Sequence, residues 1–168
     1  MDQTEENKEN ELNMYRKGAV HFILVHSYLI FLIAIIIGVF FDTFFIKEKI
    51  FSNGIYQYIG LIMLVTSSAI IYWAQETSSN YQQKKIKDNK RPLFESGPYR
   101  YLRSPTHFGL FIMTLGFSLI INSLFGIIFT LIAYGITKFI FLKKEEKLLE
   151  KKYGQEYSDY KKKVKNWV

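Results

Sequence analysis

The chain has 168 residues, of which 49% are hydrophobic and 17% aromatic, and it carries a formal net charge of +7 at pH 7. It contains no cysteine, which excludes disulfide bonds, thiolate zinc sites and a cysteine nucleophile. No glycine-rich phosphate-binding loop is encoded, so a soluble nucleotide-binding domain is not expected. The apolar residues are concentrated in long uncharged runs, and this distribution indicates a membrane protein.

Two apolar runs in the first half of the chain predict transmembrane helices. Residues 19–41 contain no charged side chain and exceed the roughly 20 residues that are needed to cross a hydrocarbon core. Residues 55–74 form a second run that ends in Tyr72 and Trp73, which are residue types that favour the lipid interface. The polar residues 1–18 precede both runs, and we expect that segment to be flexible.

Two further apolar runs, residues 106–121 and 124–142, flank Asn122 and Ser123 and predict a tight hairpin of two transmembrane helices. Charged, tyrosine-containing residues follow the hairpin to the end of the chain. The expected fold is therefore an all-α, polytopic integral membrane protein with about four transmembrane helices, a C-terminal helical hairpin and an amphipathic cytoplasmic tail.

The distribution of positive charge predicts the orientation of these spans. Of the 22 Lys and Arg residues, 19 lie before the first run, between the second and third runs, or after the fourth, whereas Lys47 and Lys49 lie on the opposite side. By the positive-inside rule, both termini and residues 75–104 are cytoplasmic. We interpret the basic charge as a signal of topology and of contact with anionic membrane lipids, not of nucleic-acid binding.

Ser104 and Pro105 predict the start of the third span, because serine can cap free backbone N–H groups and proline at the first helical position loses no hydrogen bond. The exposed amides and the positive end of the helix dipole are expected there, with Arg103 just before them and His107 on the first turn. This combination predicts a site for a small anion such as a carboxylate. The alternative is that Arg100 and Arg103 bind lipid phosphates and that Ser104 is only a cap.

Glu145 is expected just beyond the apolar layer, because it shares one helical face with Phe141 and Leu149. A carboxylate at that depth requires a cationic partner, and the candidates are Arg100, Arg103 or the sulfonium of a ligand. The alternative is that the neighbouring glutamates and lysines form ordinary solvated pairs four residues apart.

The order and spacing of these motifs resemble one known superfamily. Residues 97–109 (GPYRYLRSPTHFG), the hairpin, Glu145-Glu146 and the tail segment 153–164 (YGQEYSDYKKKV) resemble the isoprenylcysteine carboxyl methyltransferases and phospholipid methyltransferases. In that superfamily the pattern is Gly-x-Tyr-x-x-x-Arg-His-Pro-x-Tyr-x-Gly, a helical hairpin, two glutamates, and Phe/Tyr-Gly-x-x-Tyr-x-x-Tyr. The resemblance covers about the C-terminal half, from residue 91 onward.

The resemblance implies that residues 1–168 form a single methyltransferase domain that acts on a membrane-associated or lipophilic acceptor. It implies that S-adenosylmethionine enters from the cytosol and binds in the region 91–168, whereas the acceptor enters from the bilayer. Carried over by position, the cofactor-binding residues are Arg91, Pro92, Leu93, Phe94, Tyr99, Arg103, Ser104, Pro105, Thr106, His107, Glu145 and Glu146.

The chain departs from the superfamily pattern at three positions. Ser104 replaces the histidine of the motif, and His107 replaces the tyrosine three residues later, so His107 can supply the missing imidazole from one turn along the helix. Phe141 stands where members that methylate prenylcysteine have an arginine for the carboxylate of their substrate. This residue argues against a prenylcysteine acceptor and leaves a lipid amine, a small thiol or another hydrophobic nucleophile open.

Methyl transfer from a sulfonium is a direct in-line displacement, so the protein positions and desolvates the reactants and removes any proton. Glu145 is the first candidate for the proton acceptor and His107 the second. His21 and His26 lie five residues apart in the first span; we interpret them as packed or interfacial residues and expect no metal site. Two alternatives remain: an NADPH-dependent membrane reductase of the sterol reductase type, and a catalytically degenerate membrane protein of the same fold.

Overall fold

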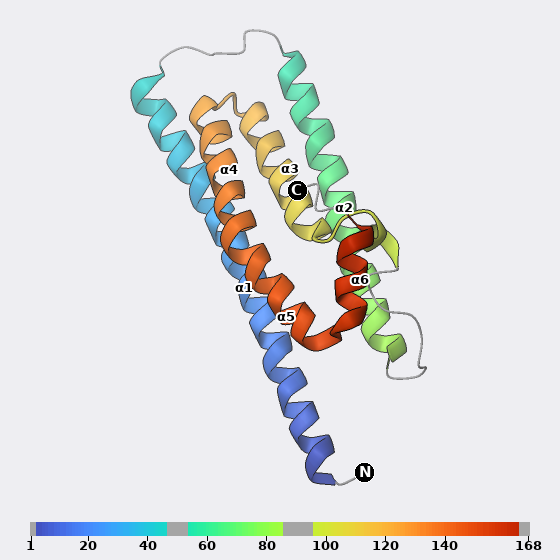
Figure 1. Cartoon of the computed structure of the whole chain (residues 1–168). Coiled ribbons are helices and arrows are strands. Elements are labelled where there is room, and N and C mark those ends of the chain that lie inside the picture. The colour runs from blue at the N-terminus through green and yellow to red at the C-terminus, as the bar shows by residue number, and fades with distance from the viewer. Residues whose placement is uncertain (1–2, 47–53, 86–95, 165–168) are drawn as a thin grey trace.

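The computed structural model describes residues 3–46, 54–85 and 96–164, and every regular element in these ranges is helical (Figure 1). The prediction of an all-α fold is confirmed. The elements are α1 (Gln3–Phe45), α2 (Ile55–Lys85), the short 3-10 helix η2 (Gly97–Arg100), α3 (Pro105–Ile120), α4 (Leu124–Ile136), the π-helical turn η3 (Thr137–Leu142), α5 (Lys143–Tyr153) and α6 (Gln155–Lys163).

The long helices are arranged so that α1 lies beside α4 and α2 lies beside α3, while α3 and α4 form the hairpin between them (Figure 1). Glycines allow the helices to approach closely in two pairs, α1 with α4 and α2 with α3. A Cβ at Gly38 of α1 would lie 2.5 Å from the Cα atom of Gly126 in α4, and a Cβ at Gly116 of α3 would lie 2.7 Å from the carbonyl oxygen of Gly60 in α2. Small residues at helix crossings are typical of membrane bundles.

Three helical stretches in the described part of the chain are long and apolar enough to cross a membrane: Leu24–Phe45, Ile55–Asn80 and Leu124–Lys151. Helix α3, which corresponds to the expected third span, is also apolar but has only 16 residues, or about 24 Å. Large apolar side chains such as Leu32 on α1 are exposed, as expected of a lipid-facing surface. These helices support the prediction of a membrane protein with several spans, and the predicted count of four depends on α3.

Several predicted boundaries differ from those of the helices. Helix α2 continues eleven residues beyond the expected end at Ala74, the fourth run continues through η3 into α5, and residues 3–18 of the polar N-terminal segment belong to α1. The reason is that Gln, Glu and Lys are good helix formers, so polarity ends a membrane span without ending its helix. The flexibility of residues 1–18 stays a prediction.

The predicted hairpin is present and is closed by a tight turn. Asn122 adopts the left-handed conformation, with φ of 58°, which asparagine tolerates better than most residues. The side chain of Ser123 caps α4 by accepting a hydrogen bond from the backbone N–H of Gly126 at 2.8 Å. Asp42 of α1 accepts hydrogen bonds from the Ser123 hydroxyl and from the N–H of Phe125. This carboxylate therefore ties α1 to the start of α4.

The tail folds back at Gly154, where φ is 56° and the chain needs the conformational freedom of glycine. Helix α6 consequently turns away from α5 and lies beside η2 and the start of α3 (Figure 1). Tyr157 and Tyr160 of α6 are buried and pack with Leu149 and Val164. The reversal of the chain thus brings the tail to the same end of the bundle as the loop before α3.

Candidate functional site

The predicted site residues meet where the start of α3, the η3 turn, α5 and α6 come together. A small recess lies at this junction and encloses about 10 Å³, which is the space of one water molecule. Its lining combines apolar and polar side chains from α3, the loop before it, the end of α4 and η3. The lining residues are Leu102, Arg103, Ser104, His107, Phe108, Tyr134, Thr137 and Leu142.

Helix α3 begins at the predicted place, with Ser104 in the cap position and a buried Pro105 as its first residue. The prediction that the Ser104 side chain caps the helix is wrong, since it makes no cap hydrogen bond in the described part of the chain. Its backbone angles, φ of −131° and ψ of 69°, differ from the extended conformation that aims a capping oxygen at the first amides. The helix start is therefore not closed by its own serine.

His107 of α3 contacts residues of both α1 and α5, and it is only 4% exposed. Its Nε2 atom lies 3.1 Å from the hydroxyl oxygen of Ser27 on α1, and its Nδ1 atom lies 3.7 Å from Oε2 of Glu145 on α5. Sequence reasoning missed Ser27, because a serine inside an apolar run carries no signal of which helix it will face. The imidazole is consequently hydrogen-bonded at Nε2, and its Nδ1 atom faces the carboxylate of Glu145.

Glu145 enters this junction from α5, and its side chain is 20% exposed. Of the partners considered for Glu145, Arg103 pairs with Glu146 instead, and the side chain that lies against Glu145 is that of His107. The sulfonium of a ligand stays a proposed partner. The buried Oε2 atom makes no hydrogen bond to any described residue, because 3.7 Å is too long for one. This oxygen therefore keeps its capacity to accept a hydrogen bond or to face a cation.

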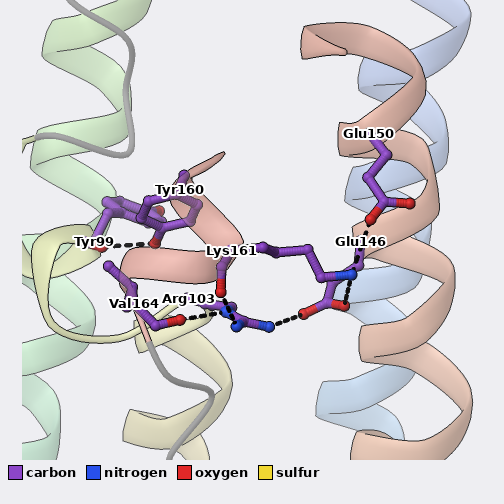
Figure 2. A network of polar contacts seen from close by, with 7 residues as sticks. All are labelled: Tyr99, Arg103, Glu146, Glu150, Tyr160, Lys161 and Val164. Atoms are coloured by element: carbon purple, nitrogen blue, oxygen red, sulfur yellow. Dashed lines mark hydrogen bonds and ion pairs between the residues drawn. The ribbon is translucent and has the colours of Figure 1, made fainter. Parts of the chain in front are cut away.

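Arg103 is directed at the tail and at Glu146 (Figure 2). Its Nη1 atom donates to Oε1 of Glu146 at 3.1 Å, its Nη2 atom to the carbonyl oxygen of Lys161 at 2.5 Å, and its Nε atom to that of Val164 at 2.7 Å. Arg103 thus satisfies carbonyl groups at the end of α6, where a cation is favourable. Its contact with a cofactor stays a prediction and requires at least one of these bonds to open.

Lys161 reinforces the same junction from α6. Its ammonium group lies 2.9 Å from Oε2 of Glu146 and 2.8 Å from Oε1 of Glu150 (Figure 2). The hydrogen bonds to Glu150 and Glu146 raise the pKa of Lys161 above its ordinary value. Glu146 is therefore shared between Arg103 and Lys161, and sequence reasoning missed this lysine because nothing in a basic tail distinguishes one cation from the next.

Tyr99 lies under the tail, and its carbonyl oxygen accepts a hydrogen bond of 2.6 Å from the hydroxyl of Tyr160 (Figure 2). Burial raises the pKa of the Tyr99 hydroxyl to about 12, the negative charge of Glu145 adds to this effect, and hydrogen bonds with Ser78 and Thr106 oppose it. Tyr99 is therefore a protonated hydroxyl group at neutral pH and lies within the field of Glu145.

The structure thus brings eight of the predicted site residues to one end of the bundle. They are Tyr99, Arg103, Ser104, Pro105, Thr106, His107, Glu145 and Glu146. The other four, Arg91, Pro92, Leu93 and Phe94, lie outside the described residues. Among the other histidines, His26 bonds through Nδ1 to the Phe22 carbonyl oxygen at 2.8 Å, and the His21 side chain lies outside the described part of the structure.

Comparison with known proteins adds one finding. A family model described as phospholipid methyltransferase matches residues 58–156, which is more than half of the chain and extends from α2 to the start of α6. The matched range includes the start of α3, the hairpin and the two glutamates. Comparisons with curated proteins and with solved structures found no match.

Proposed function

Because the chain belongs to the phospholipid methyltransferase family, we propose that it is an S-adenosylmethionine-dependent methyltransferase that acts on a lipophilic acceptor within the membrane. The observation that carries this proposal is the buried pair of His107 and Glu145 beside the recess, inside the matched range. A buried acid–base pair at a membrane boundary is suited to proton transfer and is otherwise costly to maintain.

The residues at the junction fit the charges of S-adenosylmethionine. Glu145 has an unpaired buried oxygen that suits a sulfonium or an ammonium group. The start of α3, which its own serine does not cap, suits a carboxylate. Since the recess has space for one water-sized group only, we propose that the cofactor binds between the start of α3, α5 and α6 after the tail has moved.

When bound, S-adenosylmethionine supplies a methyl group that a lone pair of the acceptor attacks in line, so that the carbon–sulfur bond breaks and a neutral thioether leaves. The residues of the chain hold the two reactants, exclude water and remove a proton where the acceptor carries one. Glu145 receives this proton and becomes a neutral acid. His107 lies 3.7 Å from Glu145 and can take the proton onward, while Ser27 holds the other nitrogen of its ring.

The acceptor is proposed to approach from the bilayer, because the outer face of α4 and η3 is apolar and exposed, as at Ile132, Ile136, Phe139 and Ile140. Phe141 stacks against His26 with ring centroids 6.4 Å apart and offers no charge to a substrate carboxylate. An acceptor of the prenylcysteine type is therefore disfavoured, and a lipid amine, a small thiol or another hydrophobic nucleophile is proposed.

We further propose that the site faces the cytoplasm, because 19 of the 22 cationic residues lie on that side of the predicted spans. The chain contains no cysteine, so single cysteines at positions 53 and 89 can be labelled without interference. Labelling of position 53, but not of position 89, from outside intact cells is expected. The reverse pattern would overturn this orientation.

The family assignment does not favour the NADPH-dependent reductase, and a binding experiment separates the remaining possibilities. Calorimetry on the purified protein in detergent is expected to detect binding of S-adenosylhomocysteine and S-adenosylmethionine but not of NADPH. Transfer of labelled methyl groups should then be followed into a total lipid extract and into small thiols. Absence of both binding and transfer would mean that the protein is a non-enzymatic member of the family.

A further inference from the structure

Several hydroxyl groups in the described helices follow one rule, which is to donate a hydrogen bond to a backbone carbonyl one turn earlier. Thr66 donates to the carbonyl oxygen of Ile62 at 2.8 Å, Ser118 to that of Thr114 at 2.9 Å, and Thr77 to that of Trp73 at 2.8 Å. Two threonines of the last long helical segment depart from the rule. The hydroxyls of Thr130 and Thr137 are buried and have no hydrogen-bond partner among the described residues.

Thr137 departs from the rule at a specific backbone feature, because it is the first residue of the π-helical turn η3. Its own N–H is shared between the carbonyl oxygens of Ala133 and Tyr134, so the regular pattern of the helix is disturbed there. Single π-helical turns inside α-helices occur frequently at functional sites. The side chain of Thr137 is only 2% exposed, and it nevertheless lines the recess.

Thr137 differs from Thr130 in its position relative to the recess. Both hydroxyls are buried and unpaired, but Thr137 lines the recess together with His107, whereas Thr130 is not part of its lining. The lining of the recess is mainly apolar, and its polar side chains include those of His107 and Thr137. Because the Thr137 hydroxyl has no hydrogen-bond partner among the described residues, a small polar group in the recess would satisfy it.

The position of Thr137 in the helix indicates which reactant this occupant belongs to. Thr137 precedes Glu145 by eight residues in one continuous helical stretch, so it lies about 12 Å farther along the axis toward the middle of the span. Phe108 and Leu142 contribute apolar side chains to the recess, and Arg103 and Ser104 line it as well. At the level of Thr137, the polar group of a lipophilic molecule entering from the bilayer would lie near His107.

We propose that the Thr137 hydroxyl hydrogen-bonds the polar group of the methyl acceptor and positions it against the pair of His107 and Glu145. This inference rests on the proposed function and makes Thr137 a determinant of acceptor binding rather than of cofactor binding. The acceptor is accordingly a lipophilic molecule whose reacting group takes part in hydrogen bonding, which favours an amine or a hydroxyl over a thiol, a weaker hydrogen-bonding group.

The test compares Thr137→Val with Thr130→Val, because each change removes one buried, unpaired hydroxyl from the same helix and keeps the shape of the side chain. Thr137→Ser retains the hydroxyl and serves as the rescue. Each purified variant is mixed in detergent with vesicles of a total lipid extract, and native mass spectrometry measures the lipid that it retains. Calorimetry with S-adenosylhomocysteine and transfer of labelled methyl groups to the same vesicles are measured in parallel.

Thr137→Val is expected to retain at least fivefold less lipid and to raise the KM for lipid at least fivefold. The affinity for S-adenosylhomocysteine should stay within twofold, and Thr137→Ser and Thr130→Val should behave like the wild type. Equal lipid retention by Thr137→Val and Thr130→Val would overturn the inference, because the hydroxyl would then face water only. If the wild type binds no S-adenosylhomocysteine and transfers no methyl group, the proposed function fails, and lipid retention still decides whether Thr137 holds a polar group.

Discussion

The imidazole of His107 and the carboxylate of Glu145 approach within 3.7 Å of each other, and this contact joins the first turn of α3 to α5 across the end of the membrane bundle. Ser27 of α1 fixes the opposite nitrogen of the same ring at 3.1 Å. The acid–base pair and the serine that orients it thus come from three helices, and a shift of any of these helices changes the geometry of the pair. The contact itself could not be read from the sequence, since Ser27, His107 and Glu145 are separated from one another by at least 38 residues.

Replacement of Glu145 by Gln is expected to lower methyl transfer about 10²-fold or more, because the amide cannot take up a proton. His107→Ala should produce a comparable loss, and Ser27→Ala a smaller one, since the serine only orients the ring. Asp159→Asn, on the exposed face of α6, is the control and should have no effect. Wild-type rates in both Glu145→Gln and His107→Ala would show that the active site lies elsewhere.

Replacement of Arg103 by Ala is expected to release the tail, because its guanidinium group supplies three hydrogen bonds to Glu146 and to carbonyl oxygens at the end of α6. Hydrogen exchange of the α6 amides should become faster. Binding of S-adenosylhomocysteine should also weaken if Arg103 contacts the cofactor, by about 1.5 to 3 kcal/mol for a buried charge-assisted contact.

Arg100→Ala is the matched control for this prediction, since Arg100 is exposed and lies only three residues away. It should leave both measurements unchanged. Unaltered exchange in α6 of the Arg103→Ala variant would mean that Tyr160 and Lys161 are sufficient to hold the tail. In that case Arg103 would not be a positioning residue.

What could be predicted from sequence depended on how local each feature is. Pro105 marked the start of α3, and Asn122-Ser123 marked the hairpin, because helix starts and turns depend on neighbouring residues. The partner of Glu145 could not be predicted, since it depends on the packing of α3 against α5. The docking of the tail could not be predicted either, because Arg103 donates to backbone carbonyl oxygens, and every residue carries such an acceptor.

The π-helical turn is a further feature that no sequence pattern indicated. Residues 137–142 read TKFIFL, which is compatible with an ordinary apolar helix. The turn is evident only from the backbone of the structure. The position of Thr137 in the lining of the recess is likewise evident only from the structure. The same holds for the true ends of α2 and of the last long helical segment, which extend beyond the apolar residues that defined the predicted spans.

Gly116→Ala is expected to destabilise the bundle, because the new Cβ atom would lie 2.7 Å from the carbonyl oxygen of Gly60 and 2.9 Å from the Cβ atom of Met63. Backbone atoms cannot move aside without separating α2 from α3, so the thermal midpoint in detergent should fall. Gly135→Ala is the control, since a Cβ there meets no atom of the described structure within 4 Å. That variant should be neutral or slightly more stable, as alanine is the better helix former.

A pH titration of stability tests the burial of Tyr99. The pKa of this hydroxyl is raised from its ordinary value of 10.0, which applies to the unfolded chain, to about 12 in the folded protein. Between these two pH values the folded chain therefore keeps a proton that the unfolded chain loses. Stability must therefore fall as the pH rises from about 10 to 12. Over this window the loss amounts to roughly 2 to 3 kcal/mol.

Lys161, whose pKa is also raised, contributes in the same direction, since its ion pairs with Glu146 and Glu150 are lost on deprotonation. Tyr99→Phe should consequently remove part of the decline of the thermal midpoint between pH 10 and 12 but not all of it. Tyr101→Phe, which alters an exposed tyrosine two residues away, should leave the decline unchanged. If the two variants show the same pH profile, the Tyr99 hydroxyl is accessible to solvent, and the tail is not docked over it in solution.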